Sequence, residues 1–170
     1  MVAAMTDEWT VPLADLATAA LSACRARGLM VATAESCTGG LVAAALTEIA
    51  GSSDVVERGF VTYSNAAKIG MLGVPADLIE RVGAVSAEVA RAMAEGAVGN
   101  SEASIAVAVT GIAGPGGATE TKPVGLVHFA AARRGGPTVD ERHVLPGDRA
   151  AIRRRSVAIA LRMVREAAAR

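Results

Sequence analysis

The sequence has very few aromatic side chains. Of its 170 residues, aromatic ones make up 2%, with one Trp, one Tyr and two Phe. Because hydrophobic residues nevertheless account for 52% of the chain, the core must consist of Ala, Val, Ile and Leu. Small and β-branched side chains of this kind are typical of parallel strands that helices cover on both faces.

The sequence also lacks an excess of either charge, since 17 Lys and Arg balance 17 Asp and Glu. A broad basic surface, which nucleic acids and anionic membranes attract, is therefore not expected. We expect neither a nucleic-acid partner nor a membrane partner. A small molecule is the better prediction for the ligand.

Long apolar runs and clusters of metal-binding residues are absent as well. No apolar run in the sequence reaches the roughly 18 residues of a membrane span, and Asp7 and Glu8 stand where a secretion signal would be basic and then apolar. Cys24 and Cys37 form neither a CxxC pair nor a Cys/His cluster. These features predict a cytoplasmic protein in a reducing compartment, without a metal site.

Hydrophobic periodicity predicts one α/β domain. We expect an N-terminal extension over residues 1–12 and a single domain over residues 13–168, long enough to bury about 70% of the surface of the unfolded chain. Helices are predicted for 13–27, 39–50, 66–72, 76–82, 86–99 and 148–168, and strands for 29–34, 59–64, 104–110, 124–132 and 139–145. The last two strands should form a hairpin. This order predicts a three-layer α/β/α sandwich with a mixed, mainly parallel sheet, in which 104–110 is central.

Two loops follow predicted strands and should meet at the carboxyl edge of the sheet, where such folds bind ligands. Glu35-Ser-Cys-Thr38 precedes a helix that opens with Gly39 and Gly40, and the segment 111–123 holds four glycines and two prolines. Free N–H groups at a helix start suit a phosphate, a carboxylate or an oxyanion. An ordinary N-cap by Ser36 or Thr38 explains the first loop equally well.

Lysine is rare in this chain, since Lys68 and Lys122 are the two lysines among 17 basic residues. A desolvated lysine can lose its proton and act as a base, whereas arginine cannot do so near neutral pH. Lys68 follows Thr62-Tyr-Ser-Asn65, which contains the single tyrosine, Tyr63. A serine and a lysine, assisted by a tyrosine, can cleave amides without metal or histidine. On local pattern alone, a solvated lysine on a helix is the alternative.

Cys37 is the other candidate nucleophile, because a helix start favours a thiolate. The usual thiol enzyme also needs a nearby histidine, and both histidines, His128 and His143, fall in predicted strands. We therefore interpret Cys37 as a packed side chain.

Seven segments in fixed order resemble the CinA C-terminal domain family over about residues 13–166. They are Ala34-Glu-Ser-Cys-Thr-Gly-Gly40, Gly51-Ser-Ser53, Arg58-Gly-Phe-Val-Thr-Tyr-Ser-Asn65 with Lys68, Gly83-Ala-Val-Ser86, Thr110-Gly-Ile-Ala-Gly-Pro115, Lys122-Pro-Val-Gly125 and Gly147-Asp-Arg149. The family includes stand-alone nicotinamide-nucleotide amidohydrolases. The resemblance implies hydrolysis of nicotinamide mononucleotide to nicotinate mononucleotide and ammonia, in pyridine-nucleotide recycling, with no metal or organic cofactor.

The resemblance also implies a serine nucleophile with Tyr63 and Lys68 as the proton-transfer pair. Ser53 is the first choice for the attacking serine and Ser36 the second. Glu35 is expected to orient Lys68 or the ribose, and a clamp of Arg149 and Arg153 to hold the phosphate. The full set expected to bind substrate is Glu35, Cys37, Thr38, Gly39, Gly40, Asn65, Thr110, Gly111, Gly114, Arg149 and Arg153.

Three further expectations concern the protein as a whole. We expect a homo-oligomer. A non-catalytic nucleotide-binding or regulatory module, linked to competence or DNA damage, is the alternative to an enzyme. A cysteine hydrolase that uses Cys37 is the third interpretation.

Overall fold

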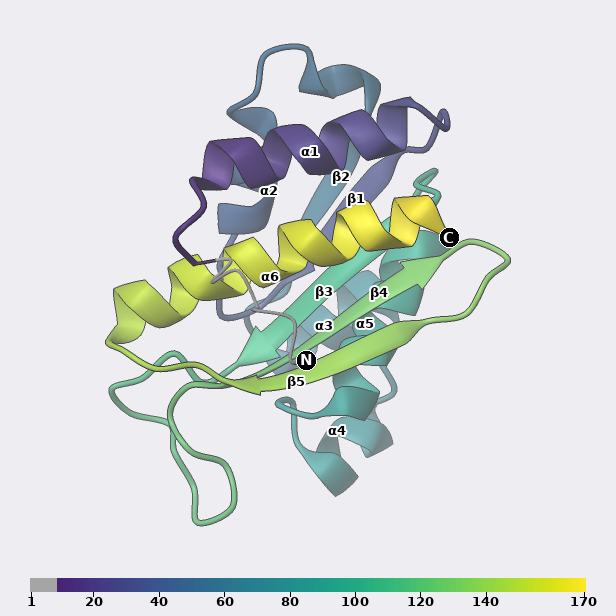
Figure 1. The fold of residues 1–170 in the computed structure, drawn as a ribbon. Coiled ribbons are helices and arrows are strands. Elements are labelled where there is room, and N and C mark those ends of the chain that lie inside the picture. The colour runs from purple at the N-terminus through teal and green to yellow at the C-terminus, as the bar shows by residue number, and fades with distance from the viewer. Residues whose placement is uncertain (1–8) are drawn as a thin grey trace, which may run out of the picture.

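The computed structural model describes residues 9–170, which form a mixed sheet of five strands between two layers of helices (Figure 1). The helices are α1 (Leu13–Arg25), α2 (Leu41–Thr47), α3 (Asn65–Leu72), α4 (Ala76–Val82), α5 (Ala87–Gly99) and α6 (Arg149–Ala169), with a short 3₁₀ turn, η1 (Ser52–Asp54). The strands are β1 (Val31–Glu35), β2 (Val56–Val61), β3 (Ile105–Gly111), β4 (Leu126–Arg133) and β5 (Val139–Val144). The predicted three-layer α/β/α fold is confirmed. Of the predicted N-terminal extension, residues 1–8 lie outside the described part.

The strand order is β2-β1-β3-β4-β5. Strands β2, β1 and β3 are parallel, and β4 runs antiparallel to both of its neighbours. The predicted hairpin of the last two strands and the central position of β3 are therefore confirmed. Three parallel strands end at one edge of the sheet, which places the loops after β1, β2 and β3 together.

The boundaries of two predicted elements were wrong. Strand β2 covers 56–61 instead of the predicted 59–64. It lies at the sheet edge, and its partly exposed first half contains the charged Glu57 and Arg58, which hide the pattern of a strand. The helix predicted for 39–50 is restricted to 41–47, since Gly39 and Gly40 have left-handed backbone angles that a helix does not allow. The shift of β2 leaves Thr62 and Tyr63 outside the sheet, at its carboxyl edge.

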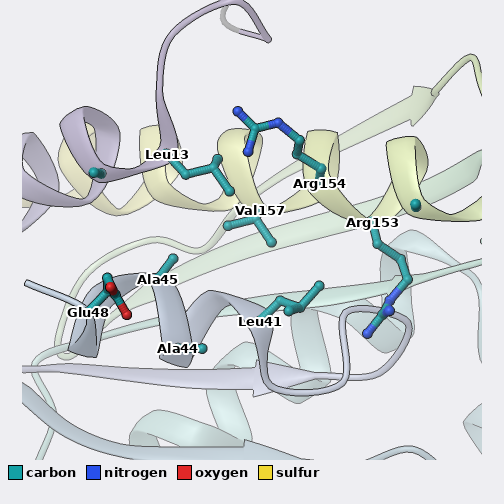
Figure 2. A pocket seen from close by; sticks show the side chains of 10 residues that line it. Leu13, Leu41, Ala44, Ala45, Glu48, Arg153, Arg154 and Val157 are labelled. Atoms are coloured by element: carbon teal, nitrogen blue, oxygen red, sulfur yellow. The ribbon is translucent and has the colours of Figure 1, made fainter.

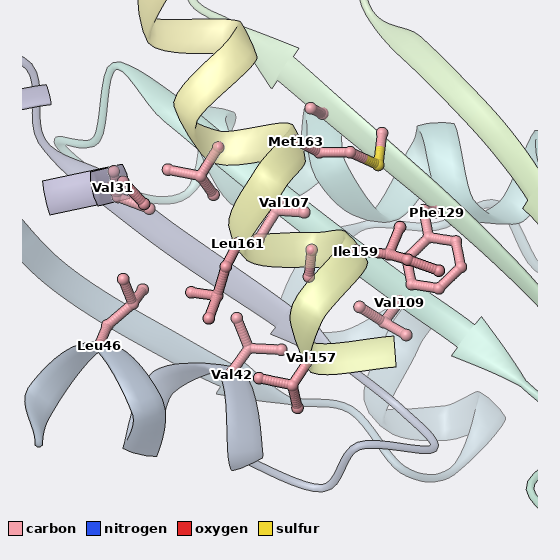
Figure 3. Packing of buried hydrophobic residues seen from close by; sticks show 14 of the residues in the cluster. Val31, Val42, Leu46, Val107, Val109, Phe129, Val157, Ile159, Leu161 and Met163 are labelled. Atoms are coloured by element: carbon pink, nitrogen blue, oxygen red, sulfur yellow. The ribbon is translucent and has the colours of Figure 1, made fainter. Parts of the chain in front are cut away.

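The two faces of the sheet carry side chains of different size. On β3, Ile105, Val107 and Val109 belong to the core cluster that includes α1, α2 and α6 (Figure 3). The alternate residues, Ala106 and Ala108, belong to the cluster that includes α5. The small side chains on this second face allow α5 to pack closely on the sheet. The larger branched side chains on the first face fill the space beneath α1 and α6 (Figure 1).

Helix α5 also lies very close to the end of α3. A Cβ atom added to Gly96 would stand 2.0 Å from the carbonyl oxygen of Leu72, so the two helices must separate to accept one. We expect Gly96→Ala to lower the free energy of unfolding by about 3 kcal/mol, since overpacking a rigid contact is destabilising. Gly99→Ala on the same helix is the matched control, because its Cβ would meet nothing within 4 Å.

Urea denaturation of both variants measures this difference. Gly99→Ala should be neutral or more stable by up to ~1 kcal/mol, because alanine is the better helix former. Equal stability of the two variants would contradict the packing described for α3 and α5.

Candidate active site

A buried lysine and a serine meet at the carboxyl edge of the parallel strands. The Lys68 Nζ atom donates a hydrogen bond to Ser36 Oγ over 3.1 Å and to the carbonyl oxygens of Thr62 over 2.9 Å and Tyr63 over 3.4 Å. Lys68 is 1% exposed, and Ser36 is partly buried. Burial lowers the pKa of Lys68 from its ordinary value of 10.5, while the nearby thiol of Cys37 acts in the opposite direction. A neutral Lys68 can take the proton of Ser36.

Helix α3 orients the lysine. Its N-cap is Ser64, whose hydroxyl accepts a hydrogen bond from the N–H of Ala67 over 3.0 Å. Lys68 and Leu72, four residues apart, occupy the buried side of this helix. Asn65, which is expected to bind substrate, is the first residue of this helix and is exposed.

Ser53, the first choice for the nucleophile, does not meet Lys68. It is an exposed residue of η1, which precedes β2, whereas Lys68 follows β2. A strand of six residues is roughly 20 Å long. Ser53 therefore lies at the amino edge of the sheet, and the serine that the structure places beside Lys68 is Ser36.

The start of α2 is capped by the carboxylate of Glu35. Its two oxygens accept hydrogen bonds from the N–H groups of Val42 over 2.8 Å and Ala43 over 3.1 Å, and the residue is 0% exposed. Gly40 is the N-cap residue and offers no side chain. Neither Ser36 nor Thr38 caps the helix, so that interpretation was wrong. The Glu35 carboxylate hydrogen-bonds to α2 and makes no hydrogen bond to Lys68, and its contact with the ribose stays a prediction.

Replacing this buried carboxylate is expected to destabilise the protein. Glu35→Gln removes the charge from two hydrogen bonds that fix α2, so we expect the free energy of unfolding to fall by about 2 kcal/mol. Glu48→Gln, at the exposed other end of α2, should change it by less than about 0.5 kcal/mol. Chemical denaturation compares the two, and an equal change in both would show that Glu35 does not cap the helix.

The N–H groups of Thr38 and Gly40, in the loop between Ser36 and α2, remain available. The N–H of Gly39 donates to Ser36 O and that of Leu41 donates to Thr38 O. Within residues 9–170, the N–H groups of Thr38 and Gly40 have no acceptor, and the buried hydroxyl of Thr38 has no partner. A negatively charged oxygen next to Ser36 could be stabilised by donors of this loop.

Arg149, at the start of α6, connects two of the loops at this edge. Its Nη1 donates to the carbonyl oxygen of Gly114 over 2.8 Å and its Nη2 to the hydroxyl of Tyr63 over 3.3 Å. The Tyr63 side chain is 62% exposed, and its phenol contacts neither Lys68 nor Ser36 within hydrogen-bonding distance. The hydrogen bond from Lys68 to Tyr63 goes to the backbone carbonyl oxygen of the tyrosine and not to its phenol.

Arg153 fixes the loop that carries Ser36. Its Nε donates to the carbonyl oxygen of Cys37 over 3.1 Å and its Nη2 to that of Thr38 over 3.2 Å. Figure 2 shows its side chain extending from α6 toward this loop, while Arg154 points away from it. Arg149 and Arg153 therefore contact different loops, and the phosphate clamp stays a prediction.

The pocket drawn in Figure 2 lies beside the site rather than in it. It has a volume of about 460 Å³ and opens between α1, α2 and α6, with mainly apolar walls. Arg153 lines it, but Ser36 and Lys68 do not. The apolar walls offer no nucleophile, so we place the chemistry at the Ser36–Lys68 pair.

The glycines after β3 are explained by packing within the chain. A Cβ on Gly111 would stand 2.7 Å from a side-chain carbon of Val127 on β4, and one on Gly114 would stand 2.6 Å from Val124. The hydroxyl of Thr110 donates to the carbonyl oxygen of Ala84 over 2.8 Å. The expectation that Thr110, Gly111 and Gly114 bind substrate thus finds no support in their contacts.

The remaining candidates are buried or structural. Cys37 is 6% exposed, and burial raises the pKa of its thiol to about 12, so a nucleophilic thiolate is disfavoured. His128 and His143 lie in β4 and β5, as predicted. Among residues 9–170, no group of three His, Cys, Asp or Glu side chains is placed to hold a metal ion. None of the described helices is both long and apolar enough to span a membrane.

Comparison with known proteins identifies relatives over nearly the whole chain. The family model described as the CinA C-terminal domain matches residues 13–168. The nicotinamide-nucleotide amidohydrolase PncC of Escherichia coli is 50% identical over 157 residues, which are 92% of this chain and 93% of that protein. A crystal structure of the competence/damage inducible protein CihA from Agrobacterium tumefaciens superposes with a TM-score of 0.89 at 51% identity, and covers 93% of this chain and 96% of that one.

Other relatives are much longer than this chain. A CinA-like protein of Mycolicibacterium vanbaalenii is 58% identical over 140 residues, which are 82% of this chain but 33% of that protein. The chain therefore spans about a third of the length of such CinA-like relatives.

Proposed function

The chain belongs to the CinA C-terminal domain family, and we propose that it hydrolyses nicotinamide mononucleotide to nicotinate mononucleotide and ammonia. The observation that carries the chemistry is the hydrogen bond between the buried Lys68 Nζ and Ser36 Oγ. The substrate is proposed from the similarity to PncC, a nicotinamide-nucleotide amidohydrolase of nearly the same length. A regulatory module that only binds nucleotides would not need a lysine desolvated against a serine.

In the first half of the proposed reaction, Ser36 attacks the carbon of the carboxamide. Neutral Lys68 takes the hydroxyl proton as the new C–O bond forms, and the carbonyl oxygen becomes an oxyanion. The N–H groups of Thr38 and Gly40 are the proposed donors to this oxyanion. Protonated Lys68 then gives its proton to the amide nitrogen, the C–N bond breaks, and ammonia leaves an acyl-enzyme ester.

In the second half of the proposed reaction, water hydrolyses the acyl-enzyme ester. Neutral Lys68 takes a proton from the water as it attacks the ester carbon, and the ester bond to Ser36 breaks with return of that proton to the serine. The product is nicotinate mononucleotide. Both halves are assisted by the substrate, because its positively charged pyridinium ring withdraws electrons from the reacting carbon.

Glu35 and Arg153 are proposed as positioning residues. Glu35 fixes α2 immediately after the nucleophile's loop, and Arg153 fixes the carbonyls of Cys37 and Thr38 within that loop. With these carbonyls held by the arginine, the N–H groups of the loop keep one orientation. A preorganised set of donors needs no rearrangement during the reaction.

Tyr63 is assigned a place at the entrance rather than the role of the base. Its phenol is exposed and pairs with Arg149 instead of Ser36 or Lys68. We expect Tyr63→Phe to lower kcat less than about tenfold in an ammonia-release assay, because the lost hydroxyl pairs with Arg149 and contacts neither Ser36 nor Lys68. A loss of about 100-fold or more at unchanged KM would instead show that the hydroxyl transfers a proton.

Ammonia release tests the proposed function with two substrates, nicotinamide mononucleotide and nicotinamide riboside. We expect turnover of the mononucleotide and little of the riboside, since a nucleotide amidohydrolase should depend on the phosphate. Absence of ammonia from both compounds would overturn the proposal. Pyridine-nucleotide recycling, a cytoplasmic location and a homo-oligomer stay predictions.

A further inference from the structure

A second pocket, which several polar side chains line, lies on the α5 side of the sheet. It has a volume of about 300 Å³, and its lining includes Ala87, Glu88, Lys122, His128 and Arg142. None of these residues belongs to the Ser36–Lys68 pair or to the loop between Ser36 and α2. The pocket brings together side chains from β4, β5, the start of α5 and the loop before β4, and its polar groups have no part in the proposed reaction.

Two cationic side chains line this pocket. Lys122 Nζ donates to the carbonyl oxygen of Val82 over 2.7 Å, and Gly83 leaves room for it, since a Cβ there would stand 2.7 Å from the nitrogen. One hydrogen bond occupies one of its three donors. Arg142 makes no hydrogen bond or ion pair with any residue of the described range 9–170. Its guanidinium group therefore remains available to a ligand.

A buried histidine with an unpartnered nitrogen faces the same pocket. His128 is 8% exposed, and its Nδ1 has no hydrogen-bond partner in residues 9–170. The β4–β5 register pairs His128 directly with Arg142, so the two side chains stand next to each other on one face of the sheet. A buried polar atom without a partner is uncommon, and a ligand atom would satisfy it.

The start of α5 contributes backbone donors. The hydroxyl of Ser86 accepts a hydrogen bond from the N–H of Val89 over 3.3 Å. The preceding N–H groups of this 13-residue helix, those of Ala87 and Glu88, have no partner within the helix. Both residues line the pocket, and the partial positive charge of a helix start favours an anion there.

Negative charge near the pocket is smaller than the positive charge. Glu88 is the one carboxylate among the lining residues. Asp140, on β5, is engaged with Arg91 over 2.6 Å. Lys122 and Arg142 thus exceed Glu88 by one charge before the helix start is counted.

We propose that this pocket binds a phosphate-type oxyanion at a site separate from the Ser36–Lys68 pair. Arg142 and Lys122 supply charged donors, α5 supplies backbone N–H groups, and the His128 ring supplies a nitrogen that can donate. The anion can be free phosphate or the phosphate group of a nucleotide, and the chemistry of recognition is the same for both.

His128 offers a spectroscopic readout. Burial lowers the pKa of its ring, Arg142 and Lys122 lower it further, and Glu88 and Asp140 act in the opposite direction. A bound phosphate dianion adds negative charge beside the ring, so the pKa of His128 should rise when phosphate binds. The other histidine, His143, pairs with Glu141 and serves as an internal reference in the same NMR spectrum.

Titration of the whole protein with inorganic phosphate tests the proposal, with calorimetry and the His128 ring signals as readouts. Saturable binding is expected, and Arg142→Gln should weaken it about tenfold. Glu88→Gln should tighten it, because the opposing carboxylate is lost. Arg165→Gln, on the exposed part of α6, removes an equal charge elsewhere and should leave the phosphate affinity unchanged. Absence of saturable binding, or equal effects of Arg142→Gln and Arg165→Gln, would overturn the proposal.

A second titration, in saturating nicotinate mononucleotide, separates the two sources of phosphate. Unchanged affinity for inorganic phosphate supports a separate site. Loss of phosphate binding would show that the nucleotide's own phosphate occupies this pocket and would overturn the claim of a separate site. Neither titration requires turnover, so failure of the proposed amidohydrolase activity would be seen independently.

Discussion

Lys68→Met is expected to reduce kcat for ammonia release from nicotinamide mononucleotide by about 10³-fold or more. The substitution removes the group that takes the proton of Ser36, and within residues 9–170 Lys68 is the one ionisable side chain that hydrogen-bonds to that hydroxyl. General base catalysis alone is worth about 10² to 10⁴. Lys68→Arg should be as inactive, because arginine does not give up its proton near neutral pH.

The kcat/KM of the wild-type protein is expected to depend on pH through the ionisation of Lys68. Burial lowers the pKa of Lys68 from 10.5, so the neutral form that acts as base increases as pH rises toward and through that lowered value. The kcat/KM of the wild type should therefore rise with pH, with a midpoint below 10.5. Lys68→Met should show no such rise in its residual activity.

Denaturation and circular dichroism of the two variants provide the control. Lys68→Met should keep the secondary structure of the wild type, because methionine fills a similar volume without a buried charge. Near wild-type turnover by Lys68→Arg, or a pH profile that is unchanged in Lys68→Met, would contradict the assignment of the base.

Ser36→Ala should lose activity to the same extent as Lys68→Met, while Ser53→Ala should stay within about twofold of the wild type. The first substitution removes the hydroxyl that pairs with Lys68. The second changes an exposed residue at the opposite edge of the sheet. Steady-state ammonia release measures both, and because each variant loses one hydroxyl, the pair is matched chemically.

Two outcomes would contradict this assignment of the nucleophile. One is loss of activity in Ser53→Ala with retention in Ser36→Ala. The other is a folded Ser36→Ala that still turns over substrate at more than about a tenth of the wild-type rate. Cys37→Ser adds a further check: as the Cys37 thiol is buried, this variant should remain active.

The layered fold could be predicted because the sequence pattern is strongest where burial is greatest. Strand β3 is an almost continuous apolar run, and in the structure its alternating Val and Ala residues face helices on opposite sides of the sheet. The edge strand β2 was misplaced because two charged residues, Glu57 and Arg58, interrupt its apolar pattern. A half-buried strand is recognised by regular alternation of apolar and polar residues, and β2 does not show it.

The candidate site was predicted in part. The rarity of lysine singled out Lys68, since only lysine among the basic residues can act as a base in this chain. The family resemblance favoured Ser53 over Ser36, and sequence distance alone does not show on which edge of a sheet a residue lies. With β1 and β2 parallel, residues that follow both strands meet, and Ser36 and Lys68 are such residues.

Contacts with backbone atoms were missed altogether. Arg149 and Arg153 hold carbonyl oxygens of Gly114, Cys37 and Thr38, and a carbonyl oxygen is present at every residue, so it leaves no pattern in the sequence. Gly39 and Gly40 stand directly before α2 and have no side chain that could cap it. This was the one sequence signal that another residue, Glu35, caps the helix.

Peptide mapping of the acyl-enzyme tests the central claim most directly. The wild-type protein is mixed with nicotinamide mononucleotide, quenched in acid during turnover, digested and analysed by mass spectrometry. We predict a nicotinate mononucleotide ester on Ser36, absent from Ser36→Ala. An adduct on Ser53 or Cys37, or ammonia release at the wild-type rate from Ser36→Ala, would contradict the account.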